Sequence, residues 1–127
     1  IGVIHSPFKE KFGIPWQPGL VPGIEATVEI LPPFDRSDAV SGLEHYSHMW
    51  ILFVFDRAID QGWQPMVRPP RLGGNARVGV FASRSPFRPN PIGLSVVELL
   101  SVDAVDGRVR LQVAGGDFLD GTPVLDI

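Results

Sequence analysis

Prolines and glycines are spread along the whole of this 127-residue chain, which contains thirteen prolines and fourteen glycines. Inside a helix a proline removes a backbone hydrogen bond and clashes with the preceding turn, and a glycine costs about 1 kcal/mol relative to alanine. The stretches between them show no long pattern with the helical period of 3.6 residues. The sequence therefore excludes a helical fold, and we predict at most one short helical turn, over Ser37–Leu43.

Apolar residues instead alternate with polar ones or form short blocks between turn residues, which is typical of short antiparallel strands. Asp106-Gly107 predicts a tight hairpin turn. We predict an all-β fold for residues 1–127, a single domain built as a small, closed or nearly closed antiparallel β-barrel with long Pro/Gly-rich loops, because closure removes exposed strand edges. The predicted strands are Gly2–His5, Glu25–Leu31, Met49–Phe55, Arg77–Ala82, Leu94–Val102, Arg108–Val113 and Val124–Ile127.

The longest apolar run, Met49–Phe55, is far shorter than the roughly 20 residues of a membrane-spanning helix. We predict that it is a buried strand, and we expect no membrane partner. The chain starts at Ile1 without a methionine, so we expect that a short leader has been lost or left out.

The chain contains no cysteine, which excludes a disulfide scaffold, a thiolate metal site and a cysteine nucleophile. This composition is consistent with the reducing cytoplasm, where we expect the protein to act. His45 and His48 lie three residues apart, but neither a third histidine nor a cysteine stands at ligand spacing. We therefore expect no metal site.

Positive charge is gathered in one part of a chain whose formal net charge is −3. The stretch from Gln61 to Val97 contains five arginines and no acidic residue. Within it, the proline loop, residues 84–93, carries Arg84, Arg88 and three prolines. Proline fixes its own backbone and biases the preceding residue to extended conformations. The segment is predicted to be a rigid loop that presents its side chains to a ligand at a small entropic cost.

Several ordered motifs of uncommon residues give the chain a nearly end-to-end similarity to one family. It resembles the TsaA/TrmO (YaeB-like) family of S-adenosylmethionine-dependent tRNA methyltransferases. The motifs are Ile1–Phe8, Gln17–Gly19, Gly42–Glu44, Ser47–Phe53, Pro69–Arg77, Gly79–Ser85, Phe87–Gly93 and Asp120–Ile127. The resemblance implies methylation of the exocyclic nitrogen of N(6)-threonylcarbamoyladenosine, just 3′ of the tRNA anticodon, with S-adenosyl-L-methionine as cofactor.

The resemblance also implies which residues contact the cofactor. The pair Asp56-Arg57 departs from the family, which often has a histidine at the first of these positions, so only backbone contact is implied for the pair. The implied cofactor-binding residues are Gln17, Pro18, Gly19, Asp56, Arg57, Arg84, Leu94, Gly121, Thr122, Pro123 and Val124. For Leu94 a plain core position is a strong alternative. Core or interface anchors are the expected roles of Trp16, Trp50 and Trp63, and Trp16 is the one expected to lie over the adenine of the cofactor or over a splayed base.

Asn90 is the candidate catalytic residue, as an amide that positions the amine of the substrate. An exocyclic amine is a poor nucleophile, because its lone pair is delocalised into the ring, and an acceptor for its hydrogens favours the geometry from which nitrogen attacks. A structural turn at Asn90-Pro91 is an equally good interpretation. Methyl transfer needs mainly a near-attack geometry, so we expect a positioning site and no nucleophile motif.

Arginines are the predicted RNA contacts, because guanidinium groups bind phosphates. The candidates are Arg68, Arg71, Arg77 and Arg88, with Lys9 and Lys11 as a second group.

The expected partners are the tRNA anticodon stem-loop and a second copy of the chain, in a homodimer. Family members often carry a further C-terminal segment, which we expect to be absent here. The alternative function is a non-catalytic S-adenosylmethionine- or nucleotide-binding module, and a pure RNA-binding barrel is disfavoured by the net acidity.

Overall fold

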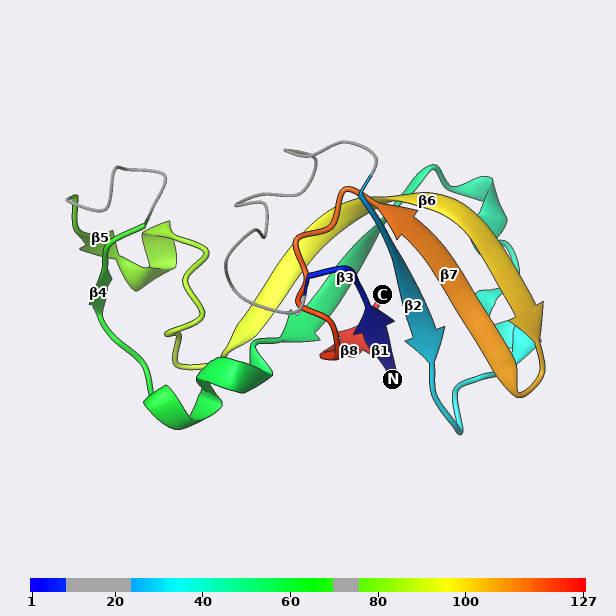
Figure 1. Cartoon of the computed structure of the whole chain (residues 1–127), viewed down its shortest axis with the longest axis horizontal. Helices are drawn as coiled ribbons and strands as arrows, with labels where there is room; N and C mark the ends of the chain where they lie inside the picture. The colour runs from blue at the N-terminus through cyan, green and yellow to red at the C-terminus, as the bar shows by residue number, and fades with distance from the viewer. Residues whose placement is uncertain (9–23, 70–75) are drawn as a thin grey trace.

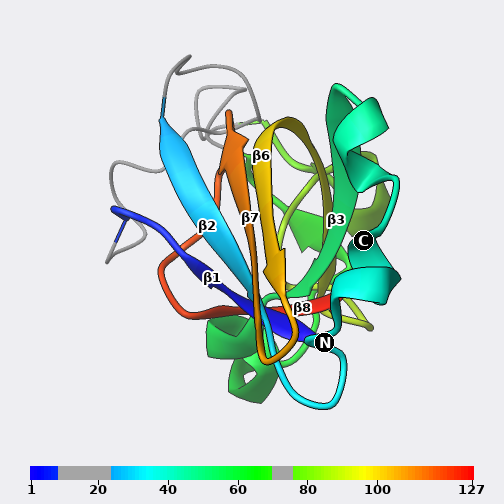
Figure 2. The same cartoon turned by 90° about the vertical axis from the view of Figure 1, so that its right-hand side faces the viewer.

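The computed structural model describes residues 1–8, 24–69 and 76–127, in which six antiparallel strands close into a barrel. The strand order is β1-β2-β7-β6-β3-β8, and β8 pairs with β1 to complete the ring (Figures 1 and 2). The barrel strands are β1 (Gly2–His5), β2 (Glu25–Ile30), β3 (His48–Val54), β6 (Ile92–Val105), β7 (Arg108–Ala114) and β8 (Thr122–Asp126). The predicted all-β barrel is confirmed.

Side chains alternate between the two faces of each strand, as the pleat requires. In β3, Met49, Ile51 and Phe53 are buried in the barrel, whereas Trp50 is 58% exposed. The prediction that the apolar run is a buried strand is therefore wrong for its outward-facing half. The core alternative for Trp50 and Trp63 is wrong as well, since both are exposed, and the other alternative, an interface anchor, stays a prediction. The core includes Ile4, Val28, Ile51, Val97, Val109, Leu111, Val113, Phe118 and Val124.

Between β3 and β6 the chain leaves the barrel as an arm, described over residues 55–69 and 76–91, which reaches away from it on the left of Figure 1. The arm contains η3 (Asp56–Gln61), β4 (Met66–Val67), β5 (Val78–Gly79) and η5 (Val80–Ala82). β4 and β5 pair with each other in a separate two-stranded sheet.

The predicted barrel strand Arg77–Ala82 is therefore wrong, because only Val78 and Gly79 are in a strand and that strand lies outside the barrel. The strand ends at Gly79, and the carbonyl of the next residue, Val80, accepts hydrogen bonds from the Ser83 backbone, the Ser83 hydroxyl and the Arg88 guanidinium. Three donors on one carbonyl stabilise a 3-10 turn there.

The predicted helical turn is found as η1 (Ser37–Val40), and a second turn, η2 (Leu43–His45), follows Gly42. The turns η2, η3 and η5 were not predicted; they are too short to leave a periodic pattern. β6 also begins two residues earlier and ends three residues later than predicted.

The barrel has two ends with different structures. At the hairpin end, β6 turns into β7 through Asp106-Gly107, as predicted, with Gly107 at a φ of 86°. Hydrogen bonds from the Ser37 backbone and then from its hydroxyl lower the pKa of Asp106. At Arg36 the shift is in the opposite direction, because the hydrogen bond that its guanidinium donates to Asp38 raises the pKa of Arg36. At the arm end lie the C-terminal ends of β1, β3 and β7 and the starts of β2, β6 and β8.

Candidate functional site at the arm end of the barrel

A short loop between β7 and β8, which we call the rim loop, residues 115–121, covers the arm end of the barrel. Its central side chain, Phe118, is 2% exposed. The Phe118 ring meets the Phe53 ring edge-on, with 5.0 Å between centroids. Gly116 provides the space for this ring, since a Cβ at Gly116 would overlap it. The rim loop thus supplies the last layer of the barrel core.

The rim loop is also held from the side by the end of β1. The Ser6 backbone donates to Asp120 Oδ1 at 2.9 Å, and the Ser6 hydroxyl donates to the Phe118 carbonyl at 2.7 Å. The Asp120 backbone donates in turn to the carbonyl of Phe8 at 2.7 Å. These bonds join two segments that are far apart in sequence, so the position of the loop is fixed against the barrel.

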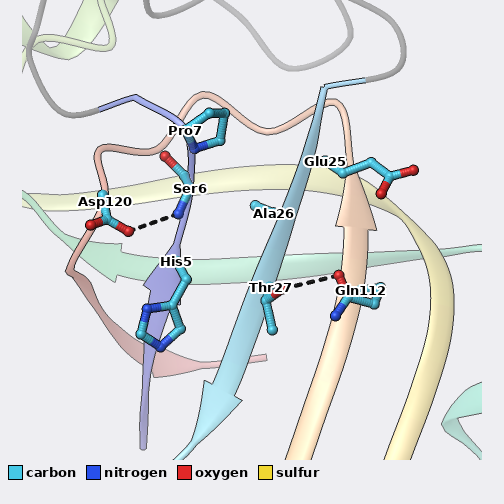
Figure 3. A pocket seen from close by; sticks show the side chains of 8 residues that line it. All are labelled: His5, Ser6, Pro7, Glu25, Ala26, Thr27, Gln112 and Asp120. Carbon is cyan, nitrogen blue, oxygen red and sulfur yellow. Dashed lines mark hydrogen bonds between the residues drawn. The ribbon is translucent and has the colours of Figure 1, made fainter.

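An open groove of about 480 Å³ lies beside this junction. Figure 3 shows it between the end of β1 and the start of β2, with Asp120 bonded to Ser6 on one side and Thr27 bonded to Gln112 on the other. The remaining lining residues are His5, Pro7, Glu25 and Ala26. The groove is polar, with two carboxylates, Glu25 and Asp120, in its wall.

On the other side of the rim loop lies a charged cluster formed by Arg84, Ser95 and Asp117. Arg84 Nη1 donates to Asp117 Oδ2 at 2.7 Å, and Arg84 Nη2 donates to the Ser95 hydroxyl at 2.9 Å and to the Leu94 carbonyl at 3.1 Å. The Ser95 hydroxyl donates to Asp117 Oδ1, also at 2.9 Å. The Asp117 side chain is 10% exposed and Ser95 is 1% exposed. The Arg84 side chain is 37% exposed, so only the carboxylate of the pair is nearly buried, and its burial is compatible with folding because both of its oxygens are bonded.

The cluster exists because β7 is shorter than β6. In the described part of the chain β7 pairs with β6 only from Glu98 to Val105, so the start of β6 has no strand on that side. Arg84 bonds the Leu94 carbonyl at this edge, and Ser95, which points inward, is within reach of Asp117. A strand edge that lacks its neighbour is thereby satisfied by side chains.

Gly93, the last residue of the proline loop, allows the backbone to pass close to the barrel core. It stands opposite Phe53 in the β3–β6 register. A Cβ at this position would overlap the Phe53 ring. Phe53 is confined in turn by Phe55 and Phe118, with centroids at 5.1 and 5.0 Å. The chain can enter β6 over this ring because residue 93 has no side chain.

Arg88, a predicted phosphate contact, has a structural task in the arm. Its Nη1 donates to the carbonyls of Val80 at 3.0 Å and Ser83 at 2.8 Å. Its guanidinium also lies 5.8 Å from the centroid of the Phe81 ring. These contacts hold the turn of the arm together, and the RNA contact of Arg88 stays a prediction.

The other predicted residues fall into three groups. Asp56, Arg57, Arg84, Asn90, Leu94, Gly121, Thr122 and Pro123 all belong to the arm end of the barrel. Arg68 and Arg77 are exposed on the arm beside β4 and β5. Lys9, Lys11, Gln17, Pro18, Gly19, Trp16 and Arg71 lie outside the described residues.

The side chains of two predicted cofactor residues, Leu94 and Val124, lie on opposite faces of the barrel wall. Leu94 is 51% exposed on the outer face of β6, so the core alternative for it is wrong. Val124 is buried in the barrel, where its side chain contributes to the core and its carbonyl accepts from the Ile1 nitrogen at 2.7 Å. Contact between Val124 and a ligand would therefore use the backbone.

Asp117 and Ser95 were not predicted from the sequence. Both stand in segments without a motif, and the only signal is the Gly115-Gly116 pair that precedes Asp117.

Within residues 1–8, 24–69 and 76–127, no three acidic or histidine side chains are grouped in a way that could hold a metal ion. The same residues include no helix of the length and hydropathy needed to span a membrane.

Comparison with known proteins identifies the family of this chain. Residues 3–127 match the model of the tRNA-methyltransferase O N-terminal domain. The chain belongs to the tRNA-methyltransferase O family. It is 58% identical over 127 residues to the Escherichia coli tRNA (adenine(37)-N6)-methyltransferase, covering 100% of this chain and 54% of that protein.

A further family relative from Pseudomonas aeruginosa, RcsF, is named as a candidate S-adenosylmethionine-dependent methyltransferase. It is 54% identical, over 100% of this chain and 53% of its own length. A crystal structure of TrmO superposes with a TM-score of 0.80 at 49% identity, over 99% of this chain and 52% of that one. The chain thus spans about half the length of the tRNA-methyltransferase O relatives that it matches.

Proposed function

We propose that this chain is the barrel domain of an S-adenosylmethionine-dependent tRNA methyltransferase that acts on adenosine 37. The observation that carries the proposal is the 58% identity over the whole chain to an enzyme named for that reaction. The finer substrate that we propose is threonylcarbamoyladenosine, whose exocyclic nitrogen receives the methyl group. In the anticodon loop the base is single-stranded, so no duplex has to open. The absence of cysteine is consistent with a cytoplasmic location.

The arm end carries a charged group, Arg84, that complements this cofactor. Its amino-acid portion carries a carboxylate and an ammonium. The guanidinium group of Arg84 matches the carboxylate, and Asp56 and Arg57 would contact the cofactor through their backbone. Space is available at Gly121, where a Cβ would meet no atom within 4 Å. These residues would hold the cofactor, which supplies a methyl group on a positively charged sulfur.

Asn90 is proposed as the residue that positions the substrate amine. Its side chain is exposed, while its carbonyl accepts from the Ile92 backbone at 2.7 Å. The backbone is thus fixed at the point from which the amide is presented. During transfer a nitrogen–carbon bond forms as the sulfur–carbon bond breaks, and the nitrogen releases one proton. Alignment of the amine over the methyl carbon supplies much of the rate increase.

The first prediction tests this reaction. With purified chain, labelled methyl donor and tRNA that carries threonylcarbamoyladenosine, we expect one methyl group in that nucleoside, measured by mass spectrometry after digestion. tRNA that lacks the threonylcarbamoyl group is the control. Donor binding without any transfer would contradict the proposal and favour the alternative, a non-catalytic S-adenosylmethionine- or nucleotide-binding module.

The RNA part of the proposal rests on the exposed arginines of the arm, Arg68 and Arg77, with Arg71, Arg88, Lys9 and Lys11 as further candidates. A variant with Arg68→Ala and Arg77→Ala belongs in the same experiment. It should bind tRNA more weakly, and the slope of log affinity against log salt should fall by about 0.7 to 0.9 for each phosphate that the variant no longer neutralises. Unchanged donor affinity in this variant separates RNA binding from cofactor binding.

A homodimer is the second element of the proposal. The outer apolar face consists of Trp50 and Leu52 on β3, Ile92, Leu94 and Val96 on β6, and Leu125 on β8. Trp50 pairs with Val96, and Leu52 with Leu94. Exposed apolar faces of this kind mark interaction sites. We assign this face to a second copy of the chain, because Leu94 belongs both to the face and to the proposed cofactor site. A second copy would then form one side of a cofactor site that is shallow in a single small barrel.

The second prediction follows from that assignment. Light scattering should give a mass near twice 13.9 kDa for the wild type and near 13.9 kDa for Trp50→Glu. The reason is that the variant would bury an unpaired charge in the interface. Phe34→Glu is the matched control, since Phe34 is exposed near the hairpin end and away from this face. A wild-type mass of 13.9 kDa at micromolar concentration would contradict the dimer.

A further inference from the structure

Asp117 is the member of the charged cluster that connects separate parts of the site. One of its carboxylate oxygens accepts from Arg84, at the start of the proline loop, and the other accepts from Ser95 on β6. Its own backbone belongs to the rim loop, which Ser6 and Phe8 hold in place. The nearly buried carboxylate is therefore mounted on a fixed support and bonds the loop that carries Arg84 and Asn90.

Arg84 is held in one orientation by these contacts. Its guanidinium is planar, and three acceptors on two different elements fix the plane: Asp117 Oδ2, the Ser95 hydroxyl and the Leu94 carbonyl. With the plane fixed, the orientation of the whole guanidinium group is fixed as well. A ligand carboxylate then meets a guanidinium that needs no further ordering, which lowers the entropic cost of binding.

We propose that Asp117 is a positioning residue for methyl transfer, which orients Arg84 and holds the proline loop against the barrel through its paired bonds to Arg84 and Ser95. The inference rests on the proposed function, since Arg84 is taken there to meet the cofactor. It adds a residue that acts through Arg84 and does not itself contact substrate or cofactor. Ser95 assists by holding the second carboxylate oxygen.

The third prediction concerns Asp117→Asn, which keeps the size of the side chain and removes its charge. The KM for the methyl donor should rise about tenfold to a hundredfold, the range expected for loss of one charge-assisted hydrogen bond. We expect a much smaller change in kcat when the donor is saturating. Ser95→Ala leaves the Arg84–Asp117 pair in place and should raise the KM in the same direction by less.

Two comparisons separate positioning from a general loss of structure. Arg84→Ala combined with Asp117→Ala should raise the donor KM no further than Arg84→Ala alone, because Asp117 acts through Arg84. Asp103→Asn is the matched control. It removes the same charge from an exposed carboxylate that lies 3.8 Å from Arg108 at the hairpin end, and it should leave the donor KM unchanged.

Amide hydrogen exchange gives a readout that does not require turnover. In Asp117→Asn and in Ser95→Ala, amides of residues 83–91 should exchange faster than in the wild type, with those of β7 unchanged. Absence of methyl transfer in the wild type would contradict the proposed function, and the exchange rates would still decide the inference. A variant that folds with wild-type exchange in residues 83–91 and a wild-type donor KM would overturn the role of Asp117.

Discussion

Replacement of Phe118 with alanine is expected to lower the free energy of unfolding by about 3 to 5 kcal/mol, the usual cost of removing a buried phenylalanine ring. Phe118 is 2% exposed, and its ring packs on Phe53 at the arm end of the barrel. The neighbours cannot collapse into the space, because Phe53 is held by strand pairing and the rim loop by Ser6. Chemical denaturation at constant pH measures the change.

The control for this fourth prediction is Phe34→Ala, which removes the same side chain from a half-exposed site near the hairpin end. A loss of no more than about 0.5 kcal/mol is expected there, as for most surface changes. Equal losses in the two variants would mean that the rim loop is not part of the core. Since the same loop carries Asp117, we also expect donor binding to weaken in Phe118→Ala under conditions in which the variant is folded.

Gly93→Ala is expected to lower the free energy of unfolding by about 1 to 3 kcal/mol, because it inserts a methyl group into filled space. The added Cβ would overlap the Phe53 ring, and that ring cannot turn aside because Phe55 and Phe118 confine it. Either β6 or the ring must shift. A shift of β6 moves Leu94 and Ser95, so the bonds of Arg84 would weaken too.

Gly79→Ala is the matched control for this fifth prediction. Gly79 lies in a strand of the arm, and a Cβ there would meet no atom within 4 Å. Its φ of −61° is accessible to alanine. We expect a change of about a few tenths of a kcal/mol at most, in either direction, from thermal or denaturant unfolding. A Gly93→Ala variant as stable as this control would show that Phe53 has room to move.

The barrel could be predicted from the sequence because its signals are local. Alternation in Glu25–Ile30 and Arg108–Ala114 and the turn at Asp106-Gly107 depend on neighbouring residues alone. The wrong strand at Arg77–Ala82 has the same local pattern. After Gly79 the Val80 carbonyl accepts from Ser83 and from the guanidinium of Arg88, and the residue pattern does not encode these contacts.

The candidate site was predicted only in part, for a similar reason. The proline loop is visible in sequence, since its prolines and arginines lie together. The charged cluster is not, because it joins Arg84, Ser95 and Asp117 across 33 residues and depends on β7 being too short to cover the start of β6. Strand length relative to a neighbour is a property of the assembled barrel, so a lone aspartate after two glycines gave no indication of its partners.

The pairing of β1 with β8 has a consequence for how the molecule forms. Gly2 lies opposite Val124, and the Ile1 nitrogen donates to the same residue's carbonyl, so the ring closes between residues that are 123 positions apart. Until β8 is in place, β1 and β3 each keep an open edge at which another chain can add a strand. Contacts so distant in sequence also slow folding. During synthesis on the ribosome the nascent barrel therefore remains an open sheet, exposed to mispairing, until β8 has emerged.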